Sequence, residues 1–340
     1  MPKNGFPLLK LPQLVLFECV ENLDVLEILI LSLLSKRARK VAQLNRWNIS
    51  EMEWELGYEN QISLSTPSDP CRKWIINYDR KNDTSKYPYF ESELTGDYVK
   101  HYLFQNNTEN NIEEMKHIVE NIWEVFRAPI RYIKIFDESF IEWLLKFQPT
   151  ILSLWIKEDV ITSFETLDRI FKNLKVESFD LESIKTDKTT KVMEPIPFPY
   201  ITVQNSYWLT LPAILNGSYT IICLYGSELT PKDINTILKE WQMGTKLQSL
   251  LSLEICTVTL LDAESCIREI YKDLNLTLSD RKDENPTIGN IHDENIYRRA
   301  QEKHRTLNLV RSDGTIGSIT RSYTVDKYRK NAIYFRLFVW

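Results

Sequence analysis

Residues 25–34 are apolar on almost every side of the helix that their sequence predicts. Eight of these ten residues are Val, Leu or Ile, with only Glu27 and Ser32 between them, and Asp24 stands where a helix N-cap is expected. A helix that is apolar all round has to be buried all round. Each large aliphatic side chain left in water would forgo roughly 1.5–3 kcal/mol. Because the N-terminal helices alone cannot cover this one, we expect either later parts of the chain or a partner protein to do so.

Helices are also predicted on both sides of this apolar segment. Pro12 suits a first helical turn, and apolar residues then recur at helical spacing over residues 12–22. A third helix is expected to begin at Ser35 and to run towards residue 46 with basic residues and no acidic one. Aromatic residues do not alternate with these basic residues, so a partner-facing or solvated surface is favoured over contact with nucleic-acid phosphates.

This N-terminal pattern resembles an F-box. The resemblance is carried by Leu11-Pro12, the spacing to Leu16 and Leu23, Asp24 with Leu26, and the close Ser35-Lys36-Arg37-x-Arg39; Phe6-Pro7 before it resembles the nematode version. The chain departs from the commonest pattern in having Gln13 and Leu14 where an acidic residue is usual, and Ala38 where an aromatic often sits.

The resemblance implies that the helices wrap around a Skp-type adaptor, which also holds a cullin. Plain core packing is the alternative role for each leucine. The adaptor-binding residues that the resemblance implies are Leu11, Pro12, Leu16, Leu23, Leu26, Leu31, Lys36 and Arg37.

Composition and charge argue against several other classes of protein. The net charge is −5, from 42 basic and 47 acidic residues, so we expect no nucleic-acid partner. Five cysteines with no CxxC pair are typical of reduced thiols. No signal peptide and no apolar run of ~20 residues is recognised, so we expect no membrane partner and a location in the cytoplasm or the nucleus.

Residues 47–149 are predicted to form a strand-rich join and a helical entry segment. Strands are expected at 47–49, 61–64, 74–78 and 130–136, and helices at 110–127 and 140–147. Turn-forming residues make 63–70 a candidate linker, and a proline-rich ending makes 183–199 another.

From residue 150 onward, short strands alternate with helices. The helices have clear start signals: Thr162 with Glu165, and Thr230-Pro231 with Asp233, which is followed by a stop at Gly244. Alternation of this kind predicts an α/β fold with a parallel sheet, as a divergent leucine-rich-repeat-like domain with short hairpins at its edges. The strands are expected at 151–156, 176–181, 200–203, 219–224 and 250–255, with a polar loop at 279–295, a hairpin turn at Asp313-Gly314 and a last strand at 332–339.

Residues 150–340 resemble the type-2 F-box-associated domain found behind many nematode F-boxes, notably in the segment LTPKDINTILKEWQMG. The expected domains are therefore an F-box at 1–46, the join at 47–149 and the F-box-associated domain at 150–340. The resemblance implies that the last domain binds a target protein and has no chemistry of its own. Tyr200, Thr202, Thr220 and Ile222 are candidates for target contact, with core packing as an equal alternative.

Signals for catalysis or for a cofactor are lacking in the sequence. The nine glycines form no GxGxxG, GxxxxGK or GxSxG motif, and His101, His117, His292 and His304 are isolated. A charge run around Asp280 lacks the glycine and the glutamate of a calcium loop. We therefore expect no metal, no cofactor and no catalysis by this chain.

The function that best fits these observations is the substrate-recognition subunit of a Skp–cullin–F-box ubiquitin ligase. Two other classes remain open. One is a repeat-type interaction protein whose N-terminal helices merely cap the repeats, and the other is an enzyme with an unrecognised site.

Overall fold

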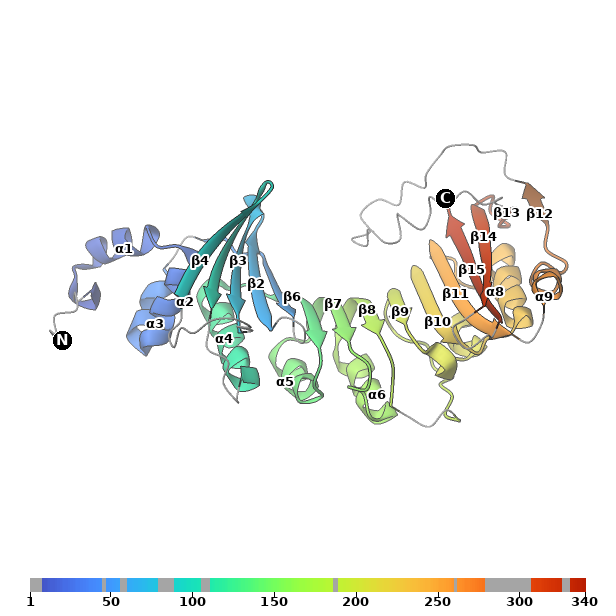
Figure 1. The fold of residues 1–340 in the computed structure, drawn as a ribbon, viewed down its shortest axis with the longest axis horizontal. Helices are drawn as coiled ribbons and strands as arrows, with labels where there is room; N and C mark the ends of the chain where they lie inside the picture. Colours follow the sequence, from blue (N-terminus) through green and yellow to red (C-terminus); the bar gives the residue numbers. More distant parts are fainter. Residues whose placement is uncertain are drawn as a thin grey trace. The chain divides into compact units, whose positions relative to one another are not determined.

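The chain forms two compact units, Met1–Phe136 and Asp137–Trp340, which are called unit 1 and unit 2 below. The computed structural model describes residues 8–44, 47–55, 60–78, 89–104, 111–185, 189–259, 262–278, 307–325 and 331–340. Figure 1 shows the ribbon with the element labels used here.

Unit 1 begins with the helices that the sequence predicted. They are α1 (Gln13–Glu21), α2 (Val25–Leu34) and α3 (Lys36–Ala42), and a short 3-10 helix that was not predicted, η1 (Leu8–Lys10), precedes them. The Asp24 carboxylate accepts a hydrogen bond from the Leu26 N–H at 3.1 Å, and Glu27 accepts one from the Asp24 N–H at 2.8 Å, which closes a capping box. Ser35 caps α3 with its hydroxyl alone, which accepts a hydrogen bond from the Ala38 N–H at 3.1 Å. The third helix ends at Ala42, before the expected residue 46.

A sheet follows the helices of unit 1, in the order β6-β1-β2-β3-β5-β4. Its strands are β1 (Glu51–Glu55), β2 (Gln61–Thr66), β3 (Asp69–Asn77), β4 (Tyr89–Thr95), β5 (Tyr98–Phe104) and β6 (Ile130–Ile135). The pairs β1–β6 and β3–β5 are parallel and the other pairs are antiparallel.

Two expectations for this region were wrong, and the pair β4–β5 was missed. The first strand lies at Glu51–Glu55 rather than at 47–49, where Trp47 instead donates its indole N–H to the Leu23 carbonyl at 3.1 Å. The expected linker 63–70 is the turn of a hairpin, in which β2 and β3 continue on both sides of Pro67 and Ser68. Turn residues marked a tight reversal here and not a domain boundary.

Helix α4 (Asn111–Phe126) covers part of α2, although 76 residues lie between the two helices in the sequence. Its buried side is formed by residues such as Met115, Val119 and Ile122, each at most 1% exposed. Ser32 Oγ on α2 and Asn121 Oδ1 on α4 lie 3.0 Å apart, so the two helices also share a buried hydrogen bond. The apolar helix is thus covered largely by a later part of its own chain.

Unit 2 contains five parallel strands in sequence order, as the alternating pattern predicted. They are β7 (Thr150–Ile156), β8 (Lys175–Leu181), β9 (Tyr200–Val203), β10 (Ile221–Ser227) and β11 (Ser252–Thr259). The helical elements before and between them are α5 (Ser139–Phe147), α6 (Phe164–Asn173), η2 (Ser206–Trp208), α7 (Leu211–Leu215) and α8 (Pro231–Met243). Right-handed crossovers that step in one direction place their helices on one side of a sheet. Figure 1 shows α5, α6 and α8 on the same side of these strands.

The helix caps of unit 2 follow the sequence signals with one shift. The Thr230 and Asp233 capping box forms as predicted, and Gly244 ends α8 in the left-handed conformation with φ 71°. In α6 the cap is Ser163, whose hydroxyl accepts from the Thr166 N–H at 3.2 Å. Thr162, the predicted cap, instead donates to the Glu138 carboxylate at 3.1 Å.

Residues 183–199 are not a free linker in unit 2. Ile184, Ile196 and Phe198 are buried there, and the Ile196 N–H donates to the Tyr219 hydroxyl at 3.0 Å. The described part of this segment therefore packs onto the unit as the connection between β8 and β9.

The sheet of unit 2 continues beyond β11 through antiparallel strands, in the order β11-β15-β14-β13-β12. The additional elements are α9 (Ala263–Ile270), β12 (Leu276–Leu278), β13 (Leu307–Val310), β14 (Ile316–Val325) and β15 (Asn331–Val339). The hairpin at Asp313-Gly314 and the last strand were predicted, whereas the predicted loop at 279–295 lies outside the described residues.

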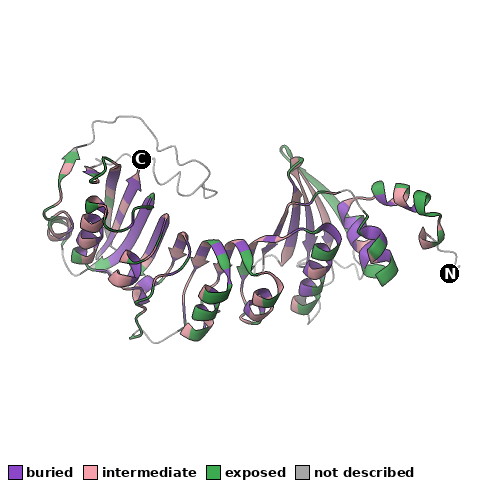
Figure 2. Cartoon of the chain, turned by 180° about the vertical axis from the view of Figure 1, so that it is seen from behind, coloured by how far each residue is buried: buried purple, intermediate pink, exposed green. Residues whose placement is uncertain are grey.

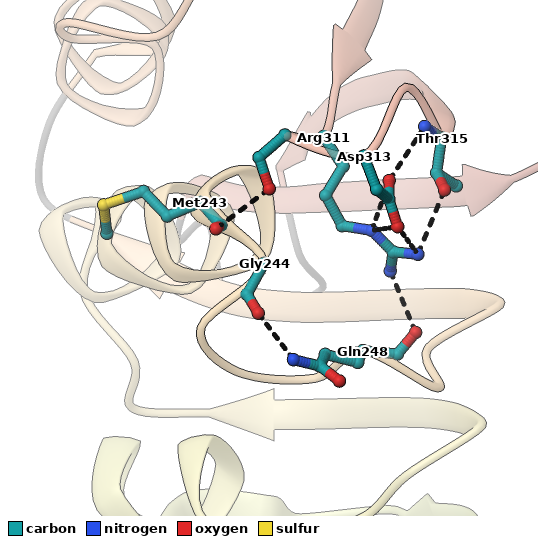
Figure 3. Close-up of polar contacts among 7 residues, drawn as sticks. Met243, Gly244, Gln248, Arg311, Asp313 and Thr315 are labelled. Carbon is teal, nitrogen blue, oxygen red and sulfur yellow. Dashed lines mark hydrogen bonds and ion pairs between the residues drawn. The ribbon is translucent and has the colours of Figure 1, made fainter.

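The turn between β13 and β14 contacts the C-terminal end of α8 through hydrogen bonds and a cation–π contact (Figure 3). The Arg311 guanidinium donates to both oxygens of Asp313 and to the Gln248 carbonyl, the latter at 2.9 Å. It also lies 5.3 Å from the centre of the Trp241 ring. The adjacent Ser312 hydroxyl donates to the Met243 carbonyl at 3.1 Å. An ion pair, a cation–π contact and hydrogen bonds therefore hold this turn against the end of α8 and the loop that follows it.

The core of unit 2 lies on the helix-covered face of its parallel strands. Figure 2 shows buried residues along these strands. Alternate residues are at most 1% exposed along each strand, as alternation of side chains predicts. These core residues include Leu154, Ile156, Phe179, Leu181, Ile201, Val203, Ile222, Leu224, Leu253 and Ile255.

Candidate functional site

The residues predicted to bind an adaptor fall into three groups in unit 1: buried, half-buried and exposed. Leu16, Leu26 and Leu31 are buried, with Leu26 only 1% exposed. Leu16 and Leu31 belong to a small apolar cluster with Val20, Ala38 and Val41, against which the half-buried Leu11 and Leu23 pack. Pro12, Lys36 and Arg37 are exposed. The buried leucines pack the helices together, and Pro12, Lys36 and Arg37 are the predicted residues that are open to solvent.

A set of exposed apolar side chains was not singled out from the sequence. Of the fifteen large apolar residues that are exposed in the described chain, five lie within residues 8–44. Leu14 on α1 is 79% exposed and Leu34 at the end of α2 is 71% exposed. Exposed apolar groups concentrated in one segment are typical of a protein-binding surface. We call this set the N-terminal apolar set: Leu14, Val15, Leu33, Leu34 and Leu44.

The basic residues of α3 have different partners. Arg37 donates to the Leu9 carbonyl at 2.7 Å and so ties η1 to α3. Arg39 forms an ion pair with Glu124 on α4 at 2.8 Å. These contacts tie α3 to its neighbours η1 and α4.

The predicted target-contact residues lie on two different faces of unit 2. Tyr200 and Thr202 are half-buried and alternate with the core residues Ile201 and Val203. Ile222 lies directly beside Ile201 in the register and is 0% exposed, so it belongs to the core face and cannot touch a target there. Thr220 is half-buried just before β10.

The face that carries Thr202 continues across the sheet through residues in direct register. This row, called the strand-face row below, consists of Trp155, Asp180, Thr202, Cys223, Glu254 and Arg336.

A buried ion pair lies in the strand-face row. Arg336 Nε lies 3.2 Å from Glu254 Oε2, and both side chains are largely buried. The Tyr225 hydroxyl donates to Glu254 Oε1 at 2.9 Å. The Glu254 carboxylate is therefore held at both oxygens, in a polar part of this face.

The histidines that the structure describes do not assemble a reactive or metal-binding centre. His101 Nδ1 lies 3.0 Å from Ser92 Oγ, and His117 lies 3.5 Å from Glu120. Within the described ranges no group of three or more His, Cys, Asp or Glu side chains is placed to hold a metal ion. His292, His304 and Asp280 lie outside those ranges. Among the described helices, none combines the length and the apolar character that crossing a bilayer requires.

Two protein-family models match the chain. The model described as F-box domain matches residues 8–49, which hold η1 to α3. The model described as F-box associated matches residues 194–255, which run from the end of the β8–β9 connection into β11. The chain therefore contains an F-box and an F-box-associated domain. The second match is shorter than the predicted range of 150–340. Together the matches cover less than a third of the 340 residues, and no catalytic family is among them.

No curated protein matches the chain, and no solved structure matches it.

Proposed function

We propose that this chain is the substrate-recognition subunit of a Skp–cullin–F-box ubiquitin ligase. The observation that carries the proposal is the presence of an F-box and an F-box-associated domain on one chain. An F-box docks its chain on the ligase, and an F-box-associated domain supplies a surface for a target. Catalysis would then belong to other subunits. The contribution of this chain would be to hold a target lysine near the ubiquitin-conjugating enzyme and so to raise its effective concentration.

The adaptor side of the proposal rests on exposed groups of unit 1. Pro12, Lys36 and the N-terminal apolar set would contact a Skp-type adaptor, which would link the chain to a cullin. The buried Leu16, Leu26 and Leu31 would act indirectly, by keeping α1, α2 and α3 in place. Burying Leu14 and Leu34 at an interface would be favourable because both are largely in contact with water in this chain.

The target side of the proposal rests on unit 2. Strands β7 to β11 begin at residues 150, 175, 200, 221 and 252 and are parallel neighbours in that order. This arrangement supports a divergent leucine-rich-repeat-like domain, in which a target binds the strand face that is opposite the helices. Tyr200 and Thr202 would contribute to that face.

The adaptor contact can be tested by co-expressing the full chain with a Skp-type adaptor and measuring how much adaptor is retained on purification. We expect the wild type to retain the adaptor and the double variant Leu14→Glu, Leu34→Glu to lose at least about 90% of it, because each carboxylate would be buried without a partner at the interface. The thermal midpoint of the isolated variant should stay within a few degrees, since both side chains are exposed.

A matched control is Leu94→Glu on β4, where the side chain is 74% exposed and lies outside the F-box helices. This variant should retain the adaptor as the wild type does. Full retention by the Leu14, Leu34 variant would show that adaptor docking does not use these residues. A wild-type chain that never retains an adaptor would contradict the ligase proposal and would leave a repeat-type interaction protein.

A further inference from the structure

A hollow of about 340 Å³ opens where β7, β8 and β9 end. These strands are parallel, so their carboxyl ends meet at one edge of the sheet and the loops that follow them lie side by side. The volume lies within the range of sites for small ligands or single side chains. The hollow is lined by Trp155, Glu158, Asp180, Glu182, Gln204 and Asn205.

The walls of this hollow are held by backbone hydrogen bonds that extend the sheet beyond its strands. The Glu158 N–H donates to Glu182 Oε2 at 2.9 Å, which fixes that carboxylate across the gap between the two loops. The Glu182 N–H donates to the Ile156 carbonyl at 3.0 Å, and the Gln204 N–H donates to the Leu181 carbonyl at 2.8 Å. The backbone of the lining loops and the Glu182 carboxylate are therefore positioned before any ligand arrives, which lowers the entropic cost of binding.

The lining chemistry selects for a positive charge. Three of the six side chains are carboxylates and none is a lysine or an arginine. Carboxylates form strong charge-assisted hydrogen bonds with ammonium and guanidinium groups. Trp155 lies beside Asp180 in the register, so an indole borders the acidic groups, and an indole is the best side-chain partner for a cation. The side-chain carbonyls of Gln204 and Asn205 can accept further hydrogen bonds.

Acidic side chains alone would mark only a solvated patch. Here two further features coincide with them: a hollow large enough to admit a long side chain, and an aromatic wall. The same face leads directly from Asp180 to Thr202 through the register of β8 and β9. A ligand in the hollow would therefore lie at the end of the strand-face row.

We propose that the hollow binds the cationic side chain of a lysine or arginine of the target protein. This inference rests on the proposed function, because it assigns the cation to a protein that lies along the strand-face row. A free polyamine carries the same ammonium chemistry, and the experiment below separates the two sources.

The test uses the full chain and an array of 15-residue peptides with mixed flanking residues and one fixed central residue. The central residue is lysine, arginine, norleucine or citrulline. Norleucine keeps the four-carbon chain of lysine without the ammonium group, and citrulline keeps the length of arginine without the charge. We expect the lysine and arginine series to retain at least about tenfold more protein than their neutral counterparts. Equal retention of charged and neutral series would overturn the proposal.

Two variants locate the effect. Asp180→Asn should abolish the preference for the charged peptides, whereas Asp168→Asn should leave it intact. Asp168 is the matched control because it is an exposed acid on α6, paired with Lys172 and outside the hollow. Its loss changes the net charge by the same amount. A preference that survives Asp180→Asn, or one that Asp168→Asn weakens equally, would contradict the assignment to the hollow. A third variant, Trp155→Leu, keeps every charge and should reduce the preference through loss of the aromatic wall.

Spermidine in solution distinguishes the two sources of the cation. If the cation belongs to a target protein, the peptide backbone and flanking residues also contribute to binding. We then expect spermidine to displace the lysine and arginine peptides only weakly, at millimolar concentration. Complete displacement of these peptides by micromolar spermidine would show that the hollow is a site for small free cations. That result would overturn the assignment to a side chain of a target protein. Adaptor retention is measured on the same protein sample, so loss of the peptide preference with intact adaptor binding rejects only the present inference. Loss of adaptor binding by the wild type rejects the proposed function.

Discussion

The Arg336 and Glu254 side chains form a charged pair in the strand-face row that we expect to be important for stability. Both groups are mostly out of water, with side-chain exposures of 14% and 7%. Removing one member of such a pair leaves the other charge buried without compensation. We predict that Arg336→Ala lowers the free energy of unfolding by about 3 kcal/mol, measured by urea denaturation of the full chain.

An exposed ion pair in the same unit provides the comparison. Arg268 and Glu264 lie four residues apart on α9, 3.0 Å from each other, and are 74% and 85% exposed. Because water screens this pair, Arg268→Ala should change the free energy of unfolding by less than about 0.5 kcal/mol. Similar effects of the two substitutions would mean that burial does not determine the importance of the Arg336 pair.

Single residues of the strand face were only partly predictable. The apolar run Ile221–Leu224 shows that β10 is buried, but in a parallel strand both faces are largely buried and the pattern does not tell them apart. Tyr200 and Thr202 alternate with buried apolar residues and lie on the face opposite the core, whereas Ile222 lies on the core face. The register between strands decides this, and it depends on partners that are distant in the sequence.

At the scale of single elements, α8 was the most predictable because its start and stop are set by local chemistry. Thr230, Asp233 and Gly244 act on backbone groups within a few residues of themselves. The pair β4–β5 was missed because its strands are stabilised by pairing with each other and with β3. The sequence pattern within each strand therefore gives weaker evidence for a strand.

The cap of α8 leads to a quantitative prediction. Thr230 accepts a hydrogen bond from the Asp233 N–H at 3.2 Å, and Asp233 accepts one in return from the Thr230 N–H at 2.8 Å. Thr230→Ala removes the first of these bonds and leaves a helix N–H without its cap. We expect the free energy of unfolding to fall by about 1 kcal/mol, as measured by chemical denaturation.

Thr236 in the middle of α8 is the matched control for this substitution. Its hydroxyl bonds back to the Lys232 carbonyl at 3.0 Å, an arrangement that gives a helix no net support. Since alanine has the higher helix propensity, Thr236→Ala should leave the stability unchanged or raise it slightly. A loss of stability as large as that of Thr230→Ala would show that the cap has no special role.

For the whole molecule, the sequence indicated that α2 needs cover on every side but could not say what supplies it. The structure shows that α4 provides much of this cover and that Trp74 on β3 donates to the Asp24 cap at 2.9 Å. Periodicity identifies which surface has to be buried, and it contains no information about which distant segment buries it. Less of the surface of α2 is therefore left for a partner to bury than its composition suggested. The exposed Leu33 and Leu34 at its end are the part of α2 that we expect to contact a partner.

Each compact unit contains a buried tyrosine that should make it sensitive to alkaline pH. Burial raises the pKa of Tyr219 in unit 2 to about 12. In unit 1, burial and the nearby Glu114 carboxylate raise the pKa of Tyr78 well above its ordinary value. An unfolded tyrosine loses its proton near pH 10. The unfolded state therefore binds fewer protons than the folded state above this pH, so the stability that is fully present below pH 10 is lost as the pH rises through the folded pKa.

We predict that the free energy of unfolding falls between pH 10 and 12 and that Tyr219→Phe makes this fall shallower, because phenylalanine has no proton to lose. The same substitution should lower stability at pH 8 by about 1–3 kcal/mol, since the Tyr219 hydroxyl accepts from the buried Ile196 N–H at 3.0 Å and that N–H would lose its partner. Tyr78→Phe is the complementary variant: the Tyr78 hydroxyl has no hydrogen-bond partner among the described residues, so its removal should leave stability at pH 8 nearly unchanged. Denaturation curves of the three proteins at pH 8, 10 and 11 test both statements. A fall with the same slope in all three would assign the alkaline sensitivity to groups other than these tyrosines.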